Sequence, residues 1–322
     1  MRIRDRALLL GTAAAGLSGY AWYAARQFED LEPESAEAPG AFLDVDGVRL
    51  HYVEAGQGEP VLLIHGLNAS TFSFRYTIPE LAQHYRVVAL DLQGFGYSAR
   101  PATAEYSQTA QAELVRRAME RLGIERAAVV GHSMGGAVAM RLAIRSPERV
   151  TRLVLVSSAT DRLLRRGLRL GRLLRPFLPI AALFTLHRKS YRRLALRFAV
   201  HDPAYVTPEV VEATFRPRRV KGTLRALGAW LVDRGLDDPV APEHILQPTL
   251  LLWGEHDRLA PLAQGEALAR SIPTARLEVV PSAGHLSLEE QPDFCNRALL
   301  EFLRSAEPAA APPWLTRTET AS

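Results

Sequence analysis

The chain has 322 residues, of which 48% are hydrophobic and 23% are charged, as expected of a globular protein with a large core. Its formal net charge is +4, and its single cysteine, Cys295, excludes an internal disulfide. No cysteine pair and no close cluster of histidine and cysteine has the spacing of metal ligands, so we expect neither a metal nor a cofactor.

The first forty residues predict a membrane or export segment followed by a linker. Arginines near the N-terminus precede an uncharged stretch, residues 7–25, which begins at Ala7 and ends at Ala25. As a helix this stretch is close to the thickness of a bilayer core, although it is rich in Ala and Gly. We interpret it as an uncleaved signal-anchor, with a cleaved signal peptide or an apolar tail helix as alternatives. Residues 31–40 predict the linker.

The charges on either side of this stretch predict its orientation. Arginines precede it and acidic residues follow it, which favours an N-terminus in the cytoplasm. We therefore expect a membrane-anchored protein whose body lies outside the cytoplasm. If the segment is cleaved, the protein is instead secreted or periplasmic.

Strands and helices then alternate along residues 41–160 and again along residues 246–304. An Asp-Gly pair between two alternating apolar segments predicts a β-hairpin over residues 42–53. Apolar runs predict further strands at residues 60–64, 86–90, 127–130, 152–156, 249–253 and 276–280. Helices are predicted at residues 72–84, 108–122, 136–146, 261–271 and 288–304. This order indicates an α/β fold with a mostly parallel central sheet and helices on both faces.

The alternation stops between residues 161 and 245, where we predict an inserted helical segment. Residues 161–200 hold eleven Lys or Arg and one acidic residue, so this segment accounts for the high isoelectric point of the chain, about 9.4. Five arginines share one face of a predicted helix: Arg162, Arg165, Arg166, Arg169 and Arg172. A second basic helix is predicted over residues 188–197, and the Ala/Pro-rich tail, 305–322, is predicted to be disordered.

The basic face has two interpretations. Beside a membrane anchor, a basic amphipathic helix predicts binding to anionic lipid. The alternative is a solvated arginine face. We expect no nucleic-acid partner, because no aromatic side chains are interleaved with the arginines. The sequence does not predict an oligomeric state.

The turn after the strand at residues 127–130 predicts a nucleophilic serine. Gly131-His132-Ser133-Met134-Gly135 follows this strand and precedes a predicted helix, the context in which Gly-x-Ser-x-Gly exposes a nucleophilic serine. Glycines leave the room that so sharp a turn needs. The helix N-terminus favours developing negative charge. An incidental serine in a glycine-rich loop is the alternative interpretation.

A serine hydroxyl needs a base, and the base needs an orienting acid. Of the nine histidines, His285 alone follows a late strand in a loop that can reach Ser133. Asp257 follows the preceding predicted strand, and we prefer it over Asp91 and Glu255 as the acid. These residues follow strands whose carboxyl ends meet at one edge of a parallel sheet.

Two backbone N–H groups are predicted to form an oxyanion hole. Met134 provides one through the serine turn, and Leu67 provides the other from the loop after the strand at residues 60–64. Gly66 allows the backbone to approach closely there, and His65 is predicted to hold the loop.

These motifs, in this order, resemble those of the α/β-hydrolase superfamily, in the branch with an inserted helical lid. The resemblance covers residues 42–304 and is carried by His65-Gly66, Asp91 with residues 94–98, 131–136, 254–257 and Gly284-His285. It implies Ser133 as nucleophile, His285 as base and Asp257 as its orienting acid. Serine at position 133, in place of aspartate, argues against the dehalogenase and epoxide-hydrolase branches.

The resemblance implies a serine hydrolase of the carboxylesterase or lipase kind. Its substrates would be carboxylic esters, apolar or lipid-like, cleaved through an acyl-enzyme. The alternatives are thioester, amide or carbon–carbon hydrolysis or acyl transfer on the same triad, or a non-catalytic ligand-binding protein. The loop after His65-Gly66 lacks the Ser-Gly-Pro-Gly stretch expected of carbon–carbon hydrolases.

The predicted organisation has four parts. Residues 1–40 are the anchor and linker, residues 41–160 with 246–304 form the core, residues 161–245 form the lid, and residues 305–322 form the tail.

Overall fold

The computed structural model describes Gly16, Tyr20, Tyr23 and residues 28–32, 38–160, 188–233 and 237–305. Its strands are β1 (Ala41–Val45), β2 (Val48–Ala55), β3 (Pro60–Ile64), β4 (Arg86–Leu90), β5 (Ala127–His132), β6 (Val150–Val156), β7 (Thr249–Gly254) and β8 (Ala275–Val280).

The helices of the core are α2 (Ile78–Leu81), α3 (Gln108–Arg121), α4 (Met134–Arg145), α10 (Leu262–Ser271), α11 (Ser287–Glu290) and α12 (Pro292–Arg304), with short 3-10 turns η2 (Thr71–Phe74), η3 (Pro147–Arg149) and η7 (Pro242–His244). Between β6 and β7 lie α7 (Lys189–Ala199), η5 (Pro203–Tyr205), α8 (Pro208–Phe215), η6 (Arg216–Arg219) and α9 (Thr223–Asp233).

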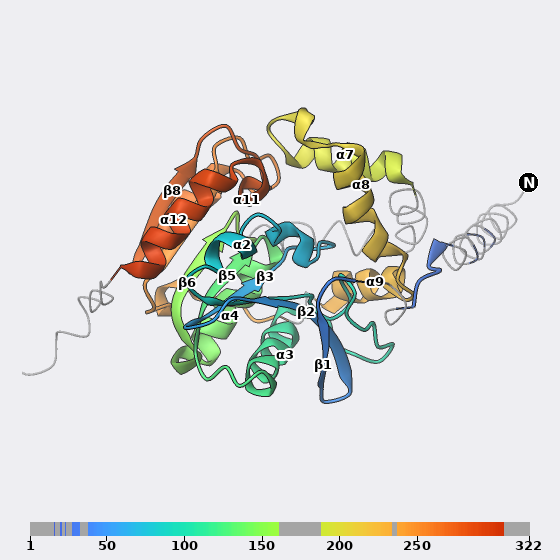
Figure 1. Ribbon diagram of the computed structural model, residues 1–322, viewed down its shortest axis with the longest axis horizontal. Helices are drawn as coiled ribbons and strands as arrows, with labels where there is room; N and C mark the ends of the chain where they lie inside the picture. Colours follow the sequence, from blue (N-terminus) through green and yellow to red (C-terminus); the bar gives the residue numbers. More distant parts are fainter. Residues whose placement is uncertain are drawn as a thin grey trace, which may run out of the picture.

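One twisted sheet of eight strands runs through the molecule in the order β1-β2-β4-β3-β5-β6-β7-β8 (Figure 1). The first two pairings, β1 with β2 and β2 with β4, are antiparallel, and all the others are parallel. The hairpin is formed as predicted: Asp46 and Gly47 have φ angles of 52° and 82°, the pair of positive values that a type I′ turn requires. The predicted α/β class is confirmed.

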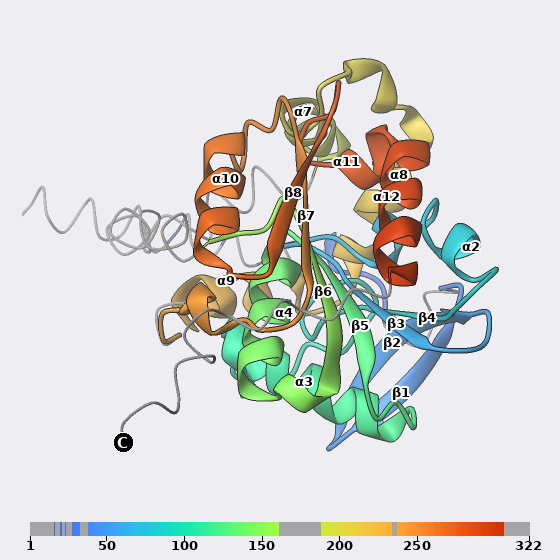
Figure 2. The ribbon, with the colours of Figure 1, turned by 90° about the vertical axis from the view of Figure 1, so that its left-hand side faces the viewer.

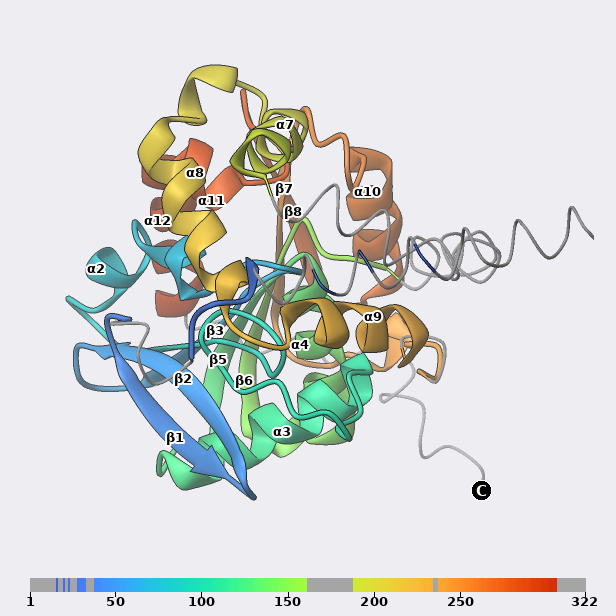
Figure 3. The same cartoon turned by 90° about the vertical axis from the view of Figure 1, so that its right-hand side faces the viewer.

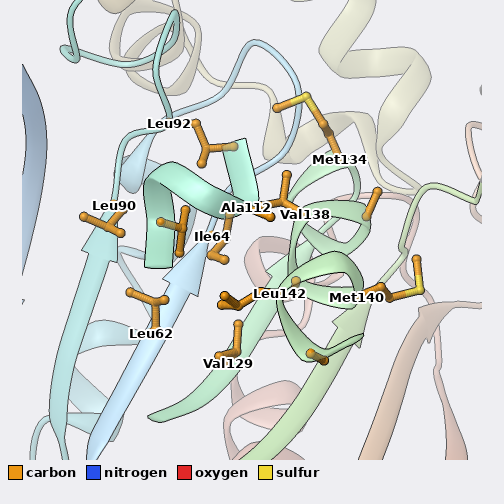
Figure 4. Close-up of a cluster of buried hydrophobic side chains, with 14 of the residues drawn as sticks. Leu62, Ile64, Leu90, Leu92, Ala112, Val129, Met134, Val138, Met140 and Leu142 are labelled. Carbon is orange, nitrogen blue, oxygen red and sulfur yellow. The ribbon is translucent and has the colours of Figure 1, made fainter. Parts of the chain in front are cut away.

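Successive side chains of each parallel strand enter two different cores. On β3, Leu62 and Ile64 pack with α3, α4 and α10, whereas Val61 and Leu63 pack with α2 and α12. This alternation is the two-residue period of a strand that is buried on both faces. Figure 2 shows α10 and α12 on opposite faces of the sheet, and Figure 4 shows the first core, in which Leu62, Val129 and Leu142 meet.

Two predicted helices are interrupted. The helix predicted at residues 72–84 becomes η2 and the short α2, because Pro79 has no N–H to donate to the carbonyl of Arg75 and so a continuous helix cannot pass through it. The helix predicted at residues 288–304 is divided into α11 and α12 at Pro292 for the same reason. The other core strands and helices lie within a few residues of the predicted bounds.

The segment between β6 and β7, residues 161–245, is called the insertion here. Its described part contributes α7 and α8, which lie at the upper right of the molecule in Figure 1, and α9, which lies below them. The backbone N–H of His285 donates to the carbonyl of Ala199 at 2.7 Å, which joins the end of α7 to the loop after β8. The predicted basic face, from Arg162 to Arg172, lies outside the described residues, and the division into domains stays a prediction.

The predicted localisation is wrong, both as a membrane-anchored chain with its body outside the cytoplasm and as a secreted or periplasmic one. Across the described residues, no helix combines the length and the apolar character needed to cross a membrane. Of residues 7–25 the structure describes Gly16, Tyr20 and Tyr23 alone. The prediction rested on the uncharged character of this stretch, although Ala and Gly, which make up about half of it, add little hydrophobicity. The signal-anchor and the membrane contact are likewise unsupported.

Candidate active site

Three predicted residues meet above the carboxyl ends of the strands. Ser133 follows β5, Asp257 follows β7 and His285 follows β8. The Ser133 hydroxyl donates to Nε2 of His285 at 3.0 Å, and Nδ1–H of His285 donates to Oδ2 of Asp257 at 2.8 Å. This chain of hydrogen bonds has the geometry that allows a histidine to take the proton of a nucleophilic hydroxyl.

The turn that presents Ser133 is tight and strained. Ser133 has φ 53° and ψ −117°, a left-handed conformation that costs a non-glycine residue on the order of 1–3 kcal/mol. A Cβ on Gly131 would lie 2.4 Å from the carbonyl oxygen of Gly135. A Cβ on Gly135 would lie 2.2 Å from the carbonyl oxygen of Ile64. The two glycines are therefore required by backbone packing around the serine.

Asp257 is held as an anion. Burial alone would raise its pKa, but the hydrogen bond and the positive field of His285 lower it below the ordinary value, helped by the Ala260 amide. Its other oxygen, Oδ1, accepts from the amides of Leu259 at 2.9 Å and Ala260 at 2.8 Å. Every carboxylate oxygen thus has a donor, which fixes the side chain toward the histidine.

The two rival acids lie elsewhere. Asp91 is fully buried and accepts from Nδ1–H of His51 at 2.7 Å and from the amides of Thr71 and Tyr97. It therefore organises the loops around it. Glu255 is half-exposed and accepts from the amide of Ser282, so it does not orient His285.

The two residues whose amides are predicted to form an oxyanion hole, Leu67 and Met134, lie beside Ser133 in the structure. Met134 is the first residue of α4, where N–H groups have no partner within the helix. A Cβ on Gly66 would lie 3.1 Å from Cβ of Ser133, so the loop that carries Leu67 is adjacent to the serine. His65 fixes this loop, since its Nε2 accepts from the Leu92 amide at 3.0 Å and its Nδ1–H donates to the Gly66 carbonyl at 2.7 Å. The role of these amides stays a proposal.

His132, within the serine turn, is buried and supports the histidine loop. Its Nε2–H donates to the carbonyl of His285 at 2.9 Å, and its Nδ1 has no partner among the described residues. Burial, and then the proximity of His285, lowers the pKa of His132 to about 3. The ring is therefore neutral in the folded protein at every pH at which an enzyme ordinarily works.

We expect the free energy of unfolding to fall as the pH falls below about 6.5, the ordinary pKa of a histidine in an unfolded chain. Between this value and about 3, the unfolded state binds a proton at His132 that the folded state does not bind. The loss reaches about 1.4 kcal/mol per pH unit for one histidine. Urea denaturation between about pH 7 and pH 5 measures it.

The matched variants are His132→Gln, whose amide can still donate to the His285 carbonyl, and His244→Gln, at an exposed position of η7. The first should reduce the pH dependence and the second should leave it unchanged. Equal slopes for the parent protein and His132→Gln would contradict the expectation.

A cavity of about 340 Å³ opens beside Ser133 and His285. The core lines one wall, and the insertion lines the other. Among the lining residues of the insertion are Arg192, Leu196 and Arg218, which sequence reasoning did not single out. Metal-binding groups of histidine, cysteine or carboxylate are absent from the part of the chain that the structure describes.

Arg218 is unusual among the cavity residues. Its side chain is 6% exposed, its Nε has no hydrogen-bond partner, and no carboxylate pairs with it among the described residues. Burial, and then repulsion from Arg192, lowers the pKa of Arg218 well below its ordinary value. Arg192 is partly buried beside it, and burial lowers its pKa to about 10. A buried arginine without an anion is costly unless a ligand supplies the anion.

The acid in the cavity wall, Glu289, is already paired. It accepts from Arg75 and from the hydroxyl of Tyr205, and Arg75 also donates to that hydroxyl at 2.9 Å. Burial opposes the charge of Arg75, but the field of Glu289 raises its pKa above the ordinary value. Glu289 therefore neutralises Arg75 and leaves Arg218 unpaired.

The chain is similar in sequence to known hydrolases. The family model described as alpha/beta hydrolase fold matches residues 59–292. A 2-hydroxymuconate semialdehyde hydrolase of Pseudomonas putida is 33% identical over 289 residues, which cover 85% of this chain and 98% of that protein. A 2-hydroxy-6-oxo-6-phenylhexa-2,4-dienoate hydrolase of Comamonas testosteroni is also 33% identical, over 81% of this chain and 93% of that protein.

Solved structures are similar over most of the chain. A meta-cleavage product hydrolase from Pseudomonas fluorescens IP01, a mutant complexed with acetates, matches with a TM-score of 0.69 and 29% identity, over 84% of this chain and 99% of that chain. A membrane phospholipase A, a bacterial virulence factor, matches with a TM-score of 0.69 and 26% identity, over 94% of this chain and 97% of that chain.

Proposed function

The chain belongs to the alpha/beta hydrolase fold family and is a hydrolase, and from this premise we propose that it is a serine hydrolase for small substrates that carry a carboxylate. Ser133 is the nucleophile, His285 the base and Asp257 the acid that orients it. The amides of Leu67 and Met134 stabilise the negative charge that develops on the attacked carbonyl oxygen.

The observation that carries this proposal is the buried, unpaired guanidinium of Arg218 in the cavity wall. A substrate carboxylate would supply the missing anion, and a charge-assisted bond to arginine is stronger than a neutral one. An acetate complex of a structural neighbour agrees with carboxylate binding by this fold.

Carbon–carbon hydrolysis beside a ketone is the reaction we propose first. The substrate in the name of the Comamonas testosteroni relative has a ketone and a carboxylate but no ester, so a hydrolase for it must break a carbon–carbon bond. Ser133 adds to the ketone carbon, and its proton passes to His285. When the bond breaks, its electron pair moves into the conjugated acid fragment, which takes up that proton. Water then hydrolyses the acyl-enzyme to a carboxylic acid and frees the serine.

Ester hydrolysis is the second candidate, and one observation favours it. The loop after His65-Gly66 reads Leu67-Asn68-Ala69-Ser70 and lacks the glycine-rich stretch expected of carbon–carbon hydrolases. The phospholipase A neighbour is consistent with an ester substrate. Here the broken bond is that between the acyl carbon and the alkoxy oxygen, and the leaving oxygen takes the proton from His285.

Two substrates separate the candidates. We expect the protein to consume 2-hydroxy-6-oxo-6-phenylhexa-2,4-dienoate with a kcat/KM at least about tenfold above that for the neutral ester p-nitrophenyl butyrate. Ser133→Ala should abolish both activities and also labelling by a fluorophosphonate probe. Turnover of the ester alone would assign ester hydrolysis, and no Ser133-dependent labelling would refute a serine hydrolase.

Replacing Arg218 by Met is expected to raise KM for the dienoate about 10- to 100-fold, the effect of losing one charge-assisted hydrogen bond. The kcat/KM for the neutral ester should change less than about twofold, because that substrate has no carboxylate. The free energy of unfolding should not fall, since Met removes an unpaired buried charge.

The matched control is Arg145→Met, which removes an exposed arginine at the end of α4 and should leave both substrates unaffected. If Arg218→Met impaired both substrates equally, the carboxylate subsite would be disproved.

A further inference from the structure

Residues 28–32 lie against the segment that joins α8 to α9, although they are almost 190 positions apart in the sequence (Figure 3). The backbone N–H of Leu31 donates to the carbonyl of Arg219 at 3.1 Å, and the N–H of Lys221 donates to the carbonyl of Leu31 at 2.9 Å. These bonds form a parallel bridge between Leu31 and Val220. The two segments are therefore hydrogen-bonded to each other as neighbouring parallel strands are.

Side chains extend the same contact on both sides. Asp30 pairs with Arg219, and Glu32 pairs with Lys221. The ring of Phe28 packs edge-on against Phe215 with 5.4 Å between centroids. The two ion pairs are largely exposed, and exposed pairs contribute little to stability individually.

Glu29 binds two backbone amides of the facing segment. One carboxylate oxygen accepts from the amide of Leu224 at 2.7 Å and the other accepts from the amide of Gly222 at 2.9 Å. These amides lie at the start of α9, where helix N–H groups have no partner within the helix. A carboxylate at this place caps the helix and also interacts favourably with its dipole.

Arg100 holds the same segment from the inner side. This buried arginine donates to the carbonyls of Gly96 at 2.8 Å and Pro217 at 3.1 Å and to the hydroxyl of Thr223 at 2.9 Å. The stretch 217–223 is therefore fixed between a loop of the core and residues 28–32. Arg218 lies within that stretch.

We propose that residues 28–32 form an intramolecular strap that keeps Arg218 in the wall of the substrate cavity, with Glu29 as the main positioning residue. The inference rests on the proposed function of Arg218 as the carboxylate subsite. Desolvation and repulsion from Arg192 both favour movement of the Arg218 guanidinium toward water. The strap opposes this movement because it fixes the backbone on both sides of Val220.

Glu29→Ala tests the strap in the full chain. We expect KM for the dienoate to rise about three- to tenfold, with kcat/KM for p-nitrophenyl butyrate unchanged, because one positioned charge is displaced while the triad is untouched. Amide hydrogen exchange in residues 217–224 should become faster. Glu29→Gln, which keeps an oxygen acceptor, should fall between the parent and Glu29→Ala.

The matched control is Glu54→Ala, which removes the ion pair between Glu54 on β2 and Arg86 on β4 and should change neither KM nor exchange in residues 217–224. A simple loss of folded protein would reduce turnover of both substrates together. Unchanged exchange and unchanged KM in Glu29→Ala would overturn the strap. If Arg218→Met spares the dienoate, the subsite fails, and the strap then stands or falls on the exchange measurement alone.

Discussion

Asp257→Asn is expected to lower kcat about 10⁴-fold, the loss that follows when a triad histidine is held in the wrong tautomer. In the folded protein, Oδ1 of Asp257 accepts from the amides of Leu259 and Ala260. The carbonyl oxygen of an asparagine would take this place, which would turn its NH₂ group toward Nδ1 of His285. The ring would then have to accept at Nδ1 and carry its proton at Nε2, where the Ser133 hydroxyl needs an acceptor.

Steady-state kcat and the rate of fluorophosphonate labelling of Ser133 both measure this effect. Glu255→Gln is the matched control, because it changes a carboxylate two positions away that bonds the Ser282 amide instead of His285. It should leave kcat unchanged. An Asp257→Asn variant that keeps more than about a tenth of the activity would contradict the proposed role of the acid.

Gly135→Ala is expected to destabilise the protein by about 3 kcal/mol or more, as backbone overlap in a packed core does. The new Cβ would lie 2.2 Å from the carbonyl oxygen of Ile64 and 2.5 Å from that of His65. Neither atom belongs to a flexible side chain, so α4 and the end of β3 must separate. That movement would displace Ser133 from the loop that carries Leu67, and labelling of the serine should be lost with stability.

Gly228→Ala is the matched control, since it also replaces a glycine inside a helix. A Cβ at this position of α9 meets no atom within 4 Å. Alanine should therefore stabilise the protein by about 0.5–1 kcal/mol, the difference in helix propensity. Urea denaturation of both variants gives the comparison. If Gly135→Ala were as stable as Gly228→Ala, the packing around the serine turn would be other than described.

Local patterns predicted the fold, and they also indicated that Ser133, Asp257 and His285 lie close together. Each buried strand is a short apolar run, and Ser133, Asp257 and His285 come directly after such runs. Since the carboxyl ends of parallel strands share one edge, adjacency in space followed from topology alone. The errors in the helices were also local, because Pro79 and Pro292 interrupt segments whose apolar pattern continues through them.

The subsite and the strap could not be predicted in this way. Arg218 stands in a run of basic residues, and nothing in that run shows which guanidinium is buried and unpaired. Burial depends on how the insertion packs on the core. Glu29 and Asp30 belong to an acidic stretch beside a predicted linker, whose composition is the same whether its carboxylates meet water or distant amides. Contacts between segments so far apart in the chain leave no periodic pattern in the sequence.

The two walls of the cavity come from different parts of the chain, and this division has a consequence for how specificity can change. The groups proposed for bond breaking follow β5, β7 and β8, whereas Arg192 and Arg218 belong to the insertion. Mutations in the insertion can therefore alter which molecules bind in the cavity without altering the groups that catalyse the reaction. Divergence within the family, or exchange of the insertion by design, can proceed on one catalytic core, provided that the strap is replaced together with the segment that it holds.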